Sequence, residues 1–116
     1  MKIYISGPIT GKDREAVGHA FEEAKRFISE AGHTPVSPLE NGLTAEARYK
    51  DHIVRDLDLM LGCEAILLLY GWNKSKGCRI EHFVAINMGL IIFTNFASLR
   101  RVNGAQAEEE YPSVGW

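Results

Sequence analysis

The chain has 116 residues, of which 46% are hydrophobic, and this is enough for one well-packed core but not for two. Its 13 basic and 15 acidic residues give a formal net charge of -2, which excludes the broad basic surface that binds polymeric nucleic acid or membranes. The two cysteines lack the density of a secreted disulfide framework, and no leader precedes the first predicted strand, so we expect a cytoplasmic protein with free thiols.

The first part of the chain predicts a strand, a helix and a second, short strand. Residues 2–6, KIYIS, are rich in β-branched and aromatic residues and end at a Gly-Pro pair, as a strand does before a tight loop. Between residues 13 and 31 the apolar residues recur at helical spacing, and Gly32 supplies the stop. Residues 33–38 have room only for a short strand, which their two prolines place toward the edge of a sheet.

The next part of the chain predicts two more helices and two more strands. Thr44 is a plausible N-cap for a second helix over residues 44–61. Residues 64–70, EAILLLY, are apolar on both faces, as in a central parallel strand covered by helices, and the run is too short to span a bilayer. A third helix is expected over residues 77–88 and a fourth strand over residues 90–94.

This alternation of strands and helices predicts an α/β fold, a three-layer sandwich with a parallel sheet of four or five strands and right-handed crossovers. We assign residues 1–96 to this domain. Residues 97–116 form a C-terminal tail that mixes charge, Gly and Pro, with a short helix expected around residues 104–110. Two alternatives stay open for the tail: it is floppy, or it packs through Tyr111 and Trp116 on the core or on a partner subunit.

Ligands of an open parallel sheet bind beyond the carboxyl ends of its strands, where three loops of this chain should meet. The first loop, SGPITGK, contains Gly7, Pro8, Thr10 and Gly11 and leads into a helix N-terminus. Free amides in such a loop can hold a phosphate or a sugar hydroxyl, although the spacing is not that of a Walker loop. The alternative is a plain strand-to-helix turn. The second loop is SPLENG, after the short strand.

The third loop gathers hydrogen-bond donors at the start of the third helix. In NKSKGC, residues 73–78, Ser75, Lys76 and the Gly77 amide are adjacent, as in sites that bind a phosphate monoester. A solvated charged loop fits the same residue types. Trp72 precedes this loop and can stack on a base, although packing in the core is the commoner role of a tryptophan.

Glu81 occupies an unusual position on the third predicted helix. At helical spacing it shares a side with Gly77, Cys78 and Ala85, which is the side expected to pack inward. Burial raises the pKa of a carboxyl group, whereas a helix N-terminus favours its ionised form. A poorly solvated nucleophile is one interpretation of Glu81, and a carboxylate that caps loop amides is the other.

Asp56 is the second carboxylate that the pattern brings to attention. It lies one helical turn from His52 and next to the apolar stripe of the second helix, where a side chain can reach a cleft. The alternative is a solvent-facing member of the charged run RDLD. His52 and Asp56 alone do not make a metal site, and neither cysteine has ligand spacing to the histidines, so we expect no metal or other cofactor.

Three segments in this order, IYISGPITG, RDLDLMLGCEAILLL and SKGCRIEHFVAINMG, resemble the nucleoside 2-deoxyribosyltransferase-like superfamily. This superfamily includes deoxyribosyltransferases, 2'-deoxynucleoside 5'-phosphate N-hydrolases and a short phage-associated branch of uncharacterised proteins, which the chain resembles most. The likeness covers roughly residues 2–95. It implies a flavodoxin-like (Rossmann-like) fold and cleavage or transfer at the N-glycosidic bond of nucleosides or nucleoside 5'-monophosphates.

The resemblance also implies roles for individual residues. The catalytic glutamate of the family matches Glu81, and the aspartate that hydrogen-bonds the base and assists its departure matches Asp56. The aromatic residue and the glycine of the first strand and loop match Tyr4 and Gly7. The serine that binds phosphate in the hydrolases matches Ser75.

We therefore predict a two-step displacement in which Glu81 forms a glycosyl-enzyme, resolved by water or a second base, with Asp56 assisting proton transfer. The predicted substrate-binding residues are Tyr4, Gly7, Pro8, Thr10, Gly11, Trp72, Ser75, Lys76 and Gly77. The expected partners are a small-molecule nucleoside or nucleotide and further copies of the chain, in a homodimer or larger homo-oligomer. A nucleotide-binding module without turnover and a phage-related interaction protein stay as alternatives.

Overall fold

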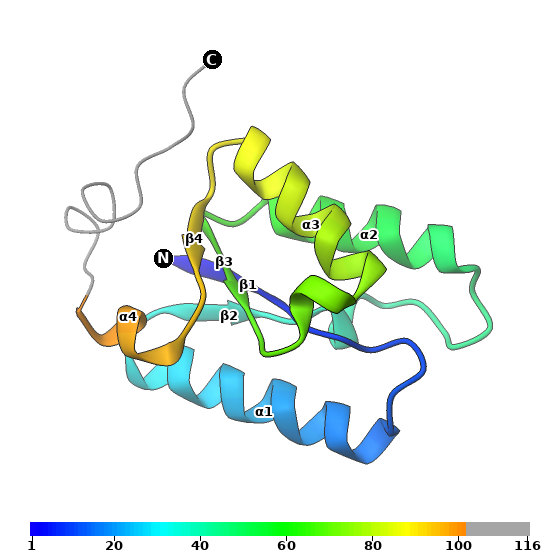
Figure 1. The fold of residues 1–116 in the computed structure, drawn as a ribbon, viewed down its shortest axis with the longest axis horizontal. Helices are drawn as coiled ribbons and strands as arrows, with labels where there is room; N and C mark the ends of the chain where they lie inside the picture. Colours follow the sequence, from blue (N-terminus) through cyan, green and yellow to red (C-terminus); the bar gives the residue numbers. More distant parts are fainter. Residues whose placement is uncertain (102–116) are drawn as a thin grey trace.

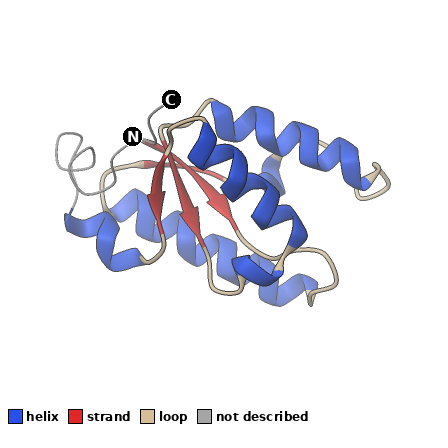
Figure 2. Cartoon of the chain, turned by 45° about the horizontal axis from the view of Figure 1, so that its top comes forward, coloured by secondary structure: helices blue, strands red, loops and turns tan. Residues whose placement is uncertain are grey.

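Four short parallel strands form the central layer of the fold, and helices cover both of its faces (Figures 1 and 2). This computed structural model describes residues 1–101. The strands are β1 (Lys2–Ser6), β2 (Thr34–Val36), β3 (Ala65–Leu68) and β4 (Ile91–Phe93). They lie in the order β2-β1-β3-β4 with every neighbouring pair parallel, which is the flavodoxin-like order. The predicted three-layer α/β sandwich is confirmed.

The helices lie in two layers, one on each face of the sheet (Figure 1). They are α1 (Arg14–Glu30), α2 (Tyr49–Leu61), α3 (Lys76–Asn87) and α4 (Phe96–Arg101). Side chains alternate along each strand, so Ile5 and Leu67 pack toward α1 and α4, whereas Tyr4 and Ile66 pack toward α2 and α3. All four residues of β3 are buried, as expected for a central strand. Among residues 1–101, no helix combines the length and apolar character needed to cross a membrane.

The start of α2 differs from the prediction that Thr44 caps this helix. The helix begins at Tyr49, five residues later. The carbonyl oxygen of Thr44 instead accepts hydrogen bonds from the Ala47 N–H at 3.1 Å and from the His52 ring at 3.1 Å, which closes a turn. The helix starts where the Asp51 carboxylate accepts the backbone N–H three residues earlier, at 3.2 Å. Thr44, whose residue type favours helix N-caps, therefore forms part of a turn before the helix.

The sequence predicts a tail after residue 96, whereas the chain forms a further short helix there. α4 packs against α1, and its buried Leu99 belongs to the core on that face of the sheet. A helix of six residues is too short to produce a recognisable periodic pattern, which explains why it was not predicted. The helix predicted around residues 104–110 and the packing predicted for Tyr111 and Trp116 lie outside the described residues.

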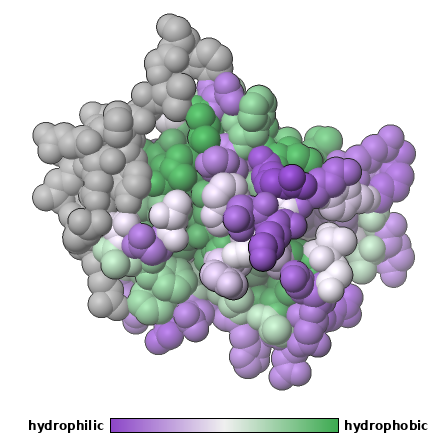
Figure 3. Space-filling model, in the orientation of Figure 1, coloured by the Kyte–Doolittle hydropathy of each residue, from purple (hydrophilic) through white to green (hydrophobic). Residues whose placement is uncertain are grey.

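The two helical layers differ in their outer surfaces. Phe83 on α3 and Val54 on α2 are both 68% exposed, whereas α1 exposes no large apolar side chain. In the space-filling view, hydrophobic residues also gather over β4 and the C-terminal end of α3, which is followed by exposed Met88 (Figure 3). An apolar outer face of this kind is typical of surfaces that contact another protein.

The loops that follow β1 and β3 come very close to each other. A Cβ atom at Gly7 would lie 2.8 Å from Leu69 Cδ1 and 3.2 Å from Phe21 Cζ, so no larger residue fits here without displacement. β2 lies on one side of β1, and β3 and β4 lie on the other side. The direction in which successive strands are added therefore reverses between β1 and β3. This is the point at which sheets of this type bind their ligands.

The buried strand β3 should dominate stability. We expect Leu67→Ala to lower the free energy of unfolding by about 2–5 kcal/mol, because Leu67 is fully buried between β1 and β4. Leu61→Ala is the matched control, since Leu61 is 45% exposed at the end of α2, and it should cost less than about 1 kcal/mol. Urea denaturation of both variants measures the difference. Equal losses would contradict this assignment of the core.

Candidate active site

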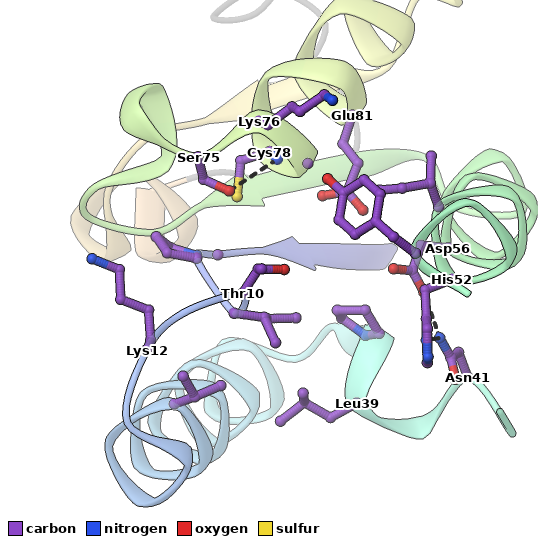
Figure 4. Close-up of a pocket in the computed structure, with 18 of the residues that line it drawn as sticks. Thr10, Lys12, Leu39, Asn41, His52, Asp56, Ser75, Lys76, Cys78 and Glu81 are labelled. Atoms are coloured by element: carbon purple, nitrogen blue, oxygen red, sulfur yellow. Dashed lines mark hydrogen bonds between the residues drawn. The ribbon is translucent and has the colours of Figure 1, made fainter. Parts of the chain in front are cut away.

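A cleft of about 1060 Å³ opens beyond the carboxyl ends of β1 and β3 (Figure 4). Its walls come from the loop after β1 with the start of α1, the segment that begins with the short helix η1 (Pro38–Glu40), the first two turns of α2, and the loop after β3 with the start of α3. Small-molecule sites typically enclose roughly 300–1,000 Å³. The cleft is therefore large enough for a ligand with several rings or phosphate groups.

Glu81 forms part of the inner wall of this cleft, where its carboxylate is held by two hydroxyl groups. Ser75 caps α3 by accepting the Cys78 N–H at 3.3 Å, which places Glu81 on the inward side in the second turn of the helix. The side chain is only 5% exposed. The Tyr4 hydroxyl donates to Glu81 Oε2 at 2.5 Å and the Ser6 hydroxyl donates to Oε1 at 2.7 Å. Each carboxylate oxygen thus has one fixed donor from β1.

The surroundings of Glu81 make its proton affinity unusually high. Burial raises the pKa of Glu81 from 4.5 to about 7, and the negative charge of Asp56 adds to the rise. The hydrogen bonds from Tyr4 and Ser6 act in the opposite direction but do not cancel the effect of burial. Burial, followed by the charge of Glu81, also raises the pKa of Tyr4, so this hydroxyl stays a donor. Near neutral pH, Glu81 can therefore exist in either protonation state.

Asp56 reaches the same cleft from α2. It is 7% exposed, and burial raises the pKa of its carboxyl group. The Asn41 side-chain amide donates to Asp56 Oδ1 at 2.9 Å, and the same nitrogen lies 3.1 Å from Nδ1 of His52. Two carboxyl groups from different helices thus line one cleft, each with its own hydrogen-bonding partners. Among residues 1–101, no cluster of three or more His, Cys, Asp or Glu side chains could hold a metal ion.

Four basic side chains line the cleft, and we call them the basic cluster: Lys12, Arg14, Lys74 and Lys76. None of them lies within 4.0 Å of a carboxylate oxygen of the described residues. In Figure 4, Lys12 and Ser75 lie on the side of the cleft opposite Asn41, His52 and Asp56. The cleft thus has four basic side chains in its lining, although the whole chain has a net charge of -2.

Most of the site residues predicted from the sequence are brought together. Those that line the cleft are Glu81, Asp56, Gly7, Pro8, Thr10, Ser75, Lys76 and Gly77. Tyr4 does not line the cleft, because it is fully buried, but it holds the Glu81 carboxylate through its hydroxyl. The position of Tyr4 therefore differs from a direct substrate contact.

Trp72 and Gly11 are not among the residues that line the cleft. Trp72 lies in a short helix, η2 (Trp72–Lys74), and its ring packs on the His82 ring with centroids 4.4 Å apart. It lines a second hollow of about 360 Å³, which shares Gly71 and Lys74 with the cleft. Gly11 has a φ of 76°, and no atom lies within 4 Å of a Cβ placed there, so its role is to permit the turn before α1. The prediction that Trp72 lines the base-binding part of the cleft is not supported.

Several residues of the cleft were missed or were predicted for other reasons. Asn41 lies in the second predicted loop, but no spacing pattern links it to Asp56. Tyr49 lies within the second predicted helix, residues 44–61, without a predicted role, yet it lines the cleft and its hydroxyl would lie 3.1 Å from a Cβ at Gly77. The nitrogen of Lys76 lies 6.0 Å from the centre of the Tyr49 ring. The signal in the sequence that could have indicated Tyr49 is an aromatic residue in a helix predicted to border the ligand site.

Comparisons with known proteins find a matching family and solved structures with a similar fold. The profile of a family described as Domain of unknown function (DUF4406) matches residues 1–94. The 2-deoxyribosyltransferase of the psychrotolerant bacterium Bacillus psychrosaccharolyticus has a similar structure, with a TM-score of 0.69 and 16% identity over 92% of this chain and 96% of that chain. The Clostridium botulinum CMP N-glycosidase has a TM-score of 0.55 and 20% identity over 79% of this chain and 66% of that chain. No curated protein matches the chain. At these identities the two structures establish a shared fold.

The buried Glu81 carboxyl should make stability depend on pH. Because its pKa is raised in the folded state, the native protein binds more protons than the unfolded chain between pH 4.5 and about 7, and stability falls as the pH rises through this range. A rise of this size corresponds to roughly 3 kcal/mol at full ionisation. Glu81→Gln has no carboxyl to ionise, so it should not lose this stability. The free energy of unfolding of Glu81→Gln minus that of wild type should therefore increase by up to about this amount between pH 4.5 and about pH 8.

Urea denaturation across this pH range measures the gain, and Glu23→Gln on the exposed face of α1 is the matched control. The control should keep a constant difference from wild type. A pH-independent difference for Glu81→Gln would contradict the raised pKa.

Proposed function

This chain belongs to the DUF4406 family, and we propose that it breaks the N-glycosidic bond of nucleoside 5'-monophosphates through a glycosyl intermediate on Glu81. The observation that carries the proposal is the buried Glu81 carboxylate, held by the Tyr4 and Ser6 hydroxyls at the wall of a large cleft. A buried carboxyl with a raised pKa is costly to the fold and is typical of active sites. The shared fold with a 2-deoxyribosyltransferase and a CMP N-glycosidase supports the same class of chemistry.

The first step is attack of a Glu81 carboxylate oxygen on the anomeric carbon C1' of the sugar. A bond forms between this oxygen and C1' while the bond from C1' to the base nitrogen breaks, and its electron pair stays on the base. In the reactive form Glu81 is ionised and the proton shared by the pair is on Asp56, whose carboxyl gives it to the departing base and becomes a carboxylate. Tyr4 and Ser6 keep the nucleophile oriented, since each donates to one of the Glu81 oxygens.

The second step releases the sugar. Water attacks C1', the ester bond to Glu81 breaks with its electron pair returning to the carboxylate, and the Asp56 carboxylate takes a proton from the water. When a second base attacks in place of water, the outcome is transfer of the sugar between bases. Hydrolysis and transfer use the same residues. The proposal therefore concerns the cleavage of the N-glycosidic bond, which is common to both.

The basic cluster supports a 5'-phosphate on the substrate. Lys12 lies on the same side of the cleft as Ser75 (Figure 4), the other three members of the cluster also line the cleft, and the first turn of α3 offers free backbone amides beside Ser75. A phosphate monoester is the group that such a cluster binds most strongly. With the phosphate at this end and the base near Asp56 at the other, the sugar would lie between them beside Glu81.

The reaction should depend on both carboxyl groups. We expect the protein to release free base from at least one deoxy- or ribonucleoside 5'-monophosphate, as measured by liquid chromatography. Glu81→Gln should lower the rate by at least about 10³-fold, because it removes the nucleophile. Asp56→Asn should lower it by about 10²–10⁴-fold, because the amide has no acid proton to give.

Glu23→Gln is the control for these variants and should keep the wild-type rate, since Glu23 is exposed on α1 and does not line the cleft. Mass spectrometry of quenched reactions should find the sugar attached to the peptide that contains Glu81. Nucleotide binding without base release, unchanged in Glu81→Gln, would identify the chain as a binding module instead.

The basic cluster should set the preference for nucleotides over nucleosides. We expect Lys74→Ala/Lys76→Ala to raise KM for a nucleoside 5'-monophosphate by about 10-fold or more, since charge-assisted hydrogen bonds to the phosphate are lost. KM for the corresponding nucleoside should change by less than about twofold. Lys2→Ala/Lys50→Ala removes the same charge away from the cleft and is the matched control. If KM rose equally for the nucleotide and the nucleoside, the phosphate would not bind at Lys74 and Lys76.

A further inference from the structure

Asn41 uses every polar atom of its side chain within the protein. Its Oδ1 accepts the backbone N–H of Leu43 at 2.9 Å, which fixes the orientation of the amide. The nitrogen Nδ2 therefore faces the other way, where Asp56 Oδ1 lies at 2.9 Å and His52 Nδ1 at 3.1 Å. An amide nitrogen carries two hydrogens, one for each of these acceptors. The buried Asn41 side chain thus has no amide hydrogen left to donate to a substrate.

This geometry determines the protonation of His52. Because Asn41 Nδ2 can only donate, His52 Nδ1 has to accept and carries no proton. The other ring nitrogen, Nε2, lies 3.1 Å from the carbonyl oxygen of Thr44, which can only accept. His52 is therefore the neutral tautomer with its proton on Nε2. An imidazolium would direct a second donor at the Asn41 amide and break their contact.

Helix α2 holds Asn41 at more than one point. The guanidinium Nε of Arg55 donates to the backbone carbonyl of Asn41 at 3.1 Å, and its Nη1 donates to Asp58 on the same helix. Arg55, Asp56 and His52 lie within a little over one turn of α2, so the amide is fixed relative to the helix that carries the acid. In Figure 4, Asn41, His52 and Asp56 form one group on the same side of the cleft.

The arrangement distinguishes the two oxygens of Asp56. Oδ1 accepts the Asn41 amide hydrogen at 2.9 Å, whereas no residue of the described part of the chain hydrogen-bonds Oδ2. In a neutral carboxyl group, the oxygen that accepts a donor is the carbonyl oxygen and the other oxygen carries the proton. The acid proton of Asp56 therefore belongs on Oδ2, and Asp56 lines the cleft.

Building on the proposed function, we propose that Asn41 and His52 are positioning residues. Neutral His52 holds the Asn41 amide, which in turn fixes Asp56 so that its acid proton sits on Oδ2, toward the departing base. The pair acts through Asp56 and touches no reacting atom. Its loss should affect the chemical step more than substrate binding.

Nuclear magnetic resonance of the wild-type protein tests the first link without any variant. Nitrogen-15 spectra of the histidine rings should show His52 with an unprotonated Nδ1 and a protonated Nε2 near neutral pH. His82, on α3, provides a ring outside this group for comparison. A proton on His52 Nδ1 would overturn the proposal. This measurement needs no activity, so it can fail or succeed independently of the proposed function.

Two substitutions of His52 test the second link. Asn places its side-chain oxygen where Nδ1 lies and keeps an acceptor for Asn41, whereas Gln reaches the position of Nε2 and keeps only the contact to Thr44. We expect His52→Gln and Asn41→Ala to lower kcat by about 10–100-fold with KM changed by less than about threefold. His52→Asn should lose less than about threefold in kcat. Equal losses in His52→Asn and His52→Gln would overturn the proposal.

Two further measurements separate positioning from damage to the fold. The double variant Asn41→Ala/His52→Gln should lose no more activity than Asn41→Ala alone, because the two residues act in series. Carbon-13 spectra should show a higher pKa for Asp56 in Asn41→Ala, since the Asn41 hydrogen bond lowers that pKa. Additive losses or an unchanged pKa would contradict the proposal. If wild type releases no base from any nucleotide, the proposed function fails, and the two spectroscopic measurements still decide this inference.

Discussion

The site depends on one buried contact, in which two hydroxyl groups of β1 hold the Glu81 carboxylate of α3. Tyr4 and Ser6 are two residues apart on a strand, so they share the face that α3 covers, while Ile3 and Ile5 between and beside them enter the opposite core. The contact therefore needs the register of the strand and the rotation of the helix to agree. The contact joins the first strand of the chain, β1, to a helix that comes much later in the sequence, α3.

The second carboxyl group is held in a different way, and this difference separates the two proposed roles. Asp56 accepts from an amide that is itself fixed by a loop and a histidine, and it comes from the helix before β3 rather than the helix after it. Burial raises the pKa of both groups and hydrogen bonds oppose the rise in both, from hydroxyl donors on both oxygens of Glu81 and from the Asn41 amide on one oxygen of Asp56. Two carboxyls with distinct surroundings are the usual way to obtain a nucleophile and an acid in one cleft.

The fold and part of the site could be predicted from the sequence because they follow local periodicity. Helical spacing places Glu81 on the inward side of α3, and uninterrupted apolar residues identify β3 as central. The failures lie where one residue type serves several local structures. Thr44 closes a turn instead of capping α2, and Trp72 packs on the His82 ring instead of lining the cleft. The contact between Asn41 and His52 depends on how a loop folds back on α2, which no spacing rule encodes.

The short edge strand β2 has a consequence for how copies of this protein can associate. It is three residues long and has Pro35 at its centre, so its middle position offers no amide hydrogen to an incoming strand. Growth of the sheet by edge-to-edge pairing is thus blocked on that side. The proline that ends the sheet at β2 therefore also disfavours the association of native molecules into fibrous aggregates through this edge.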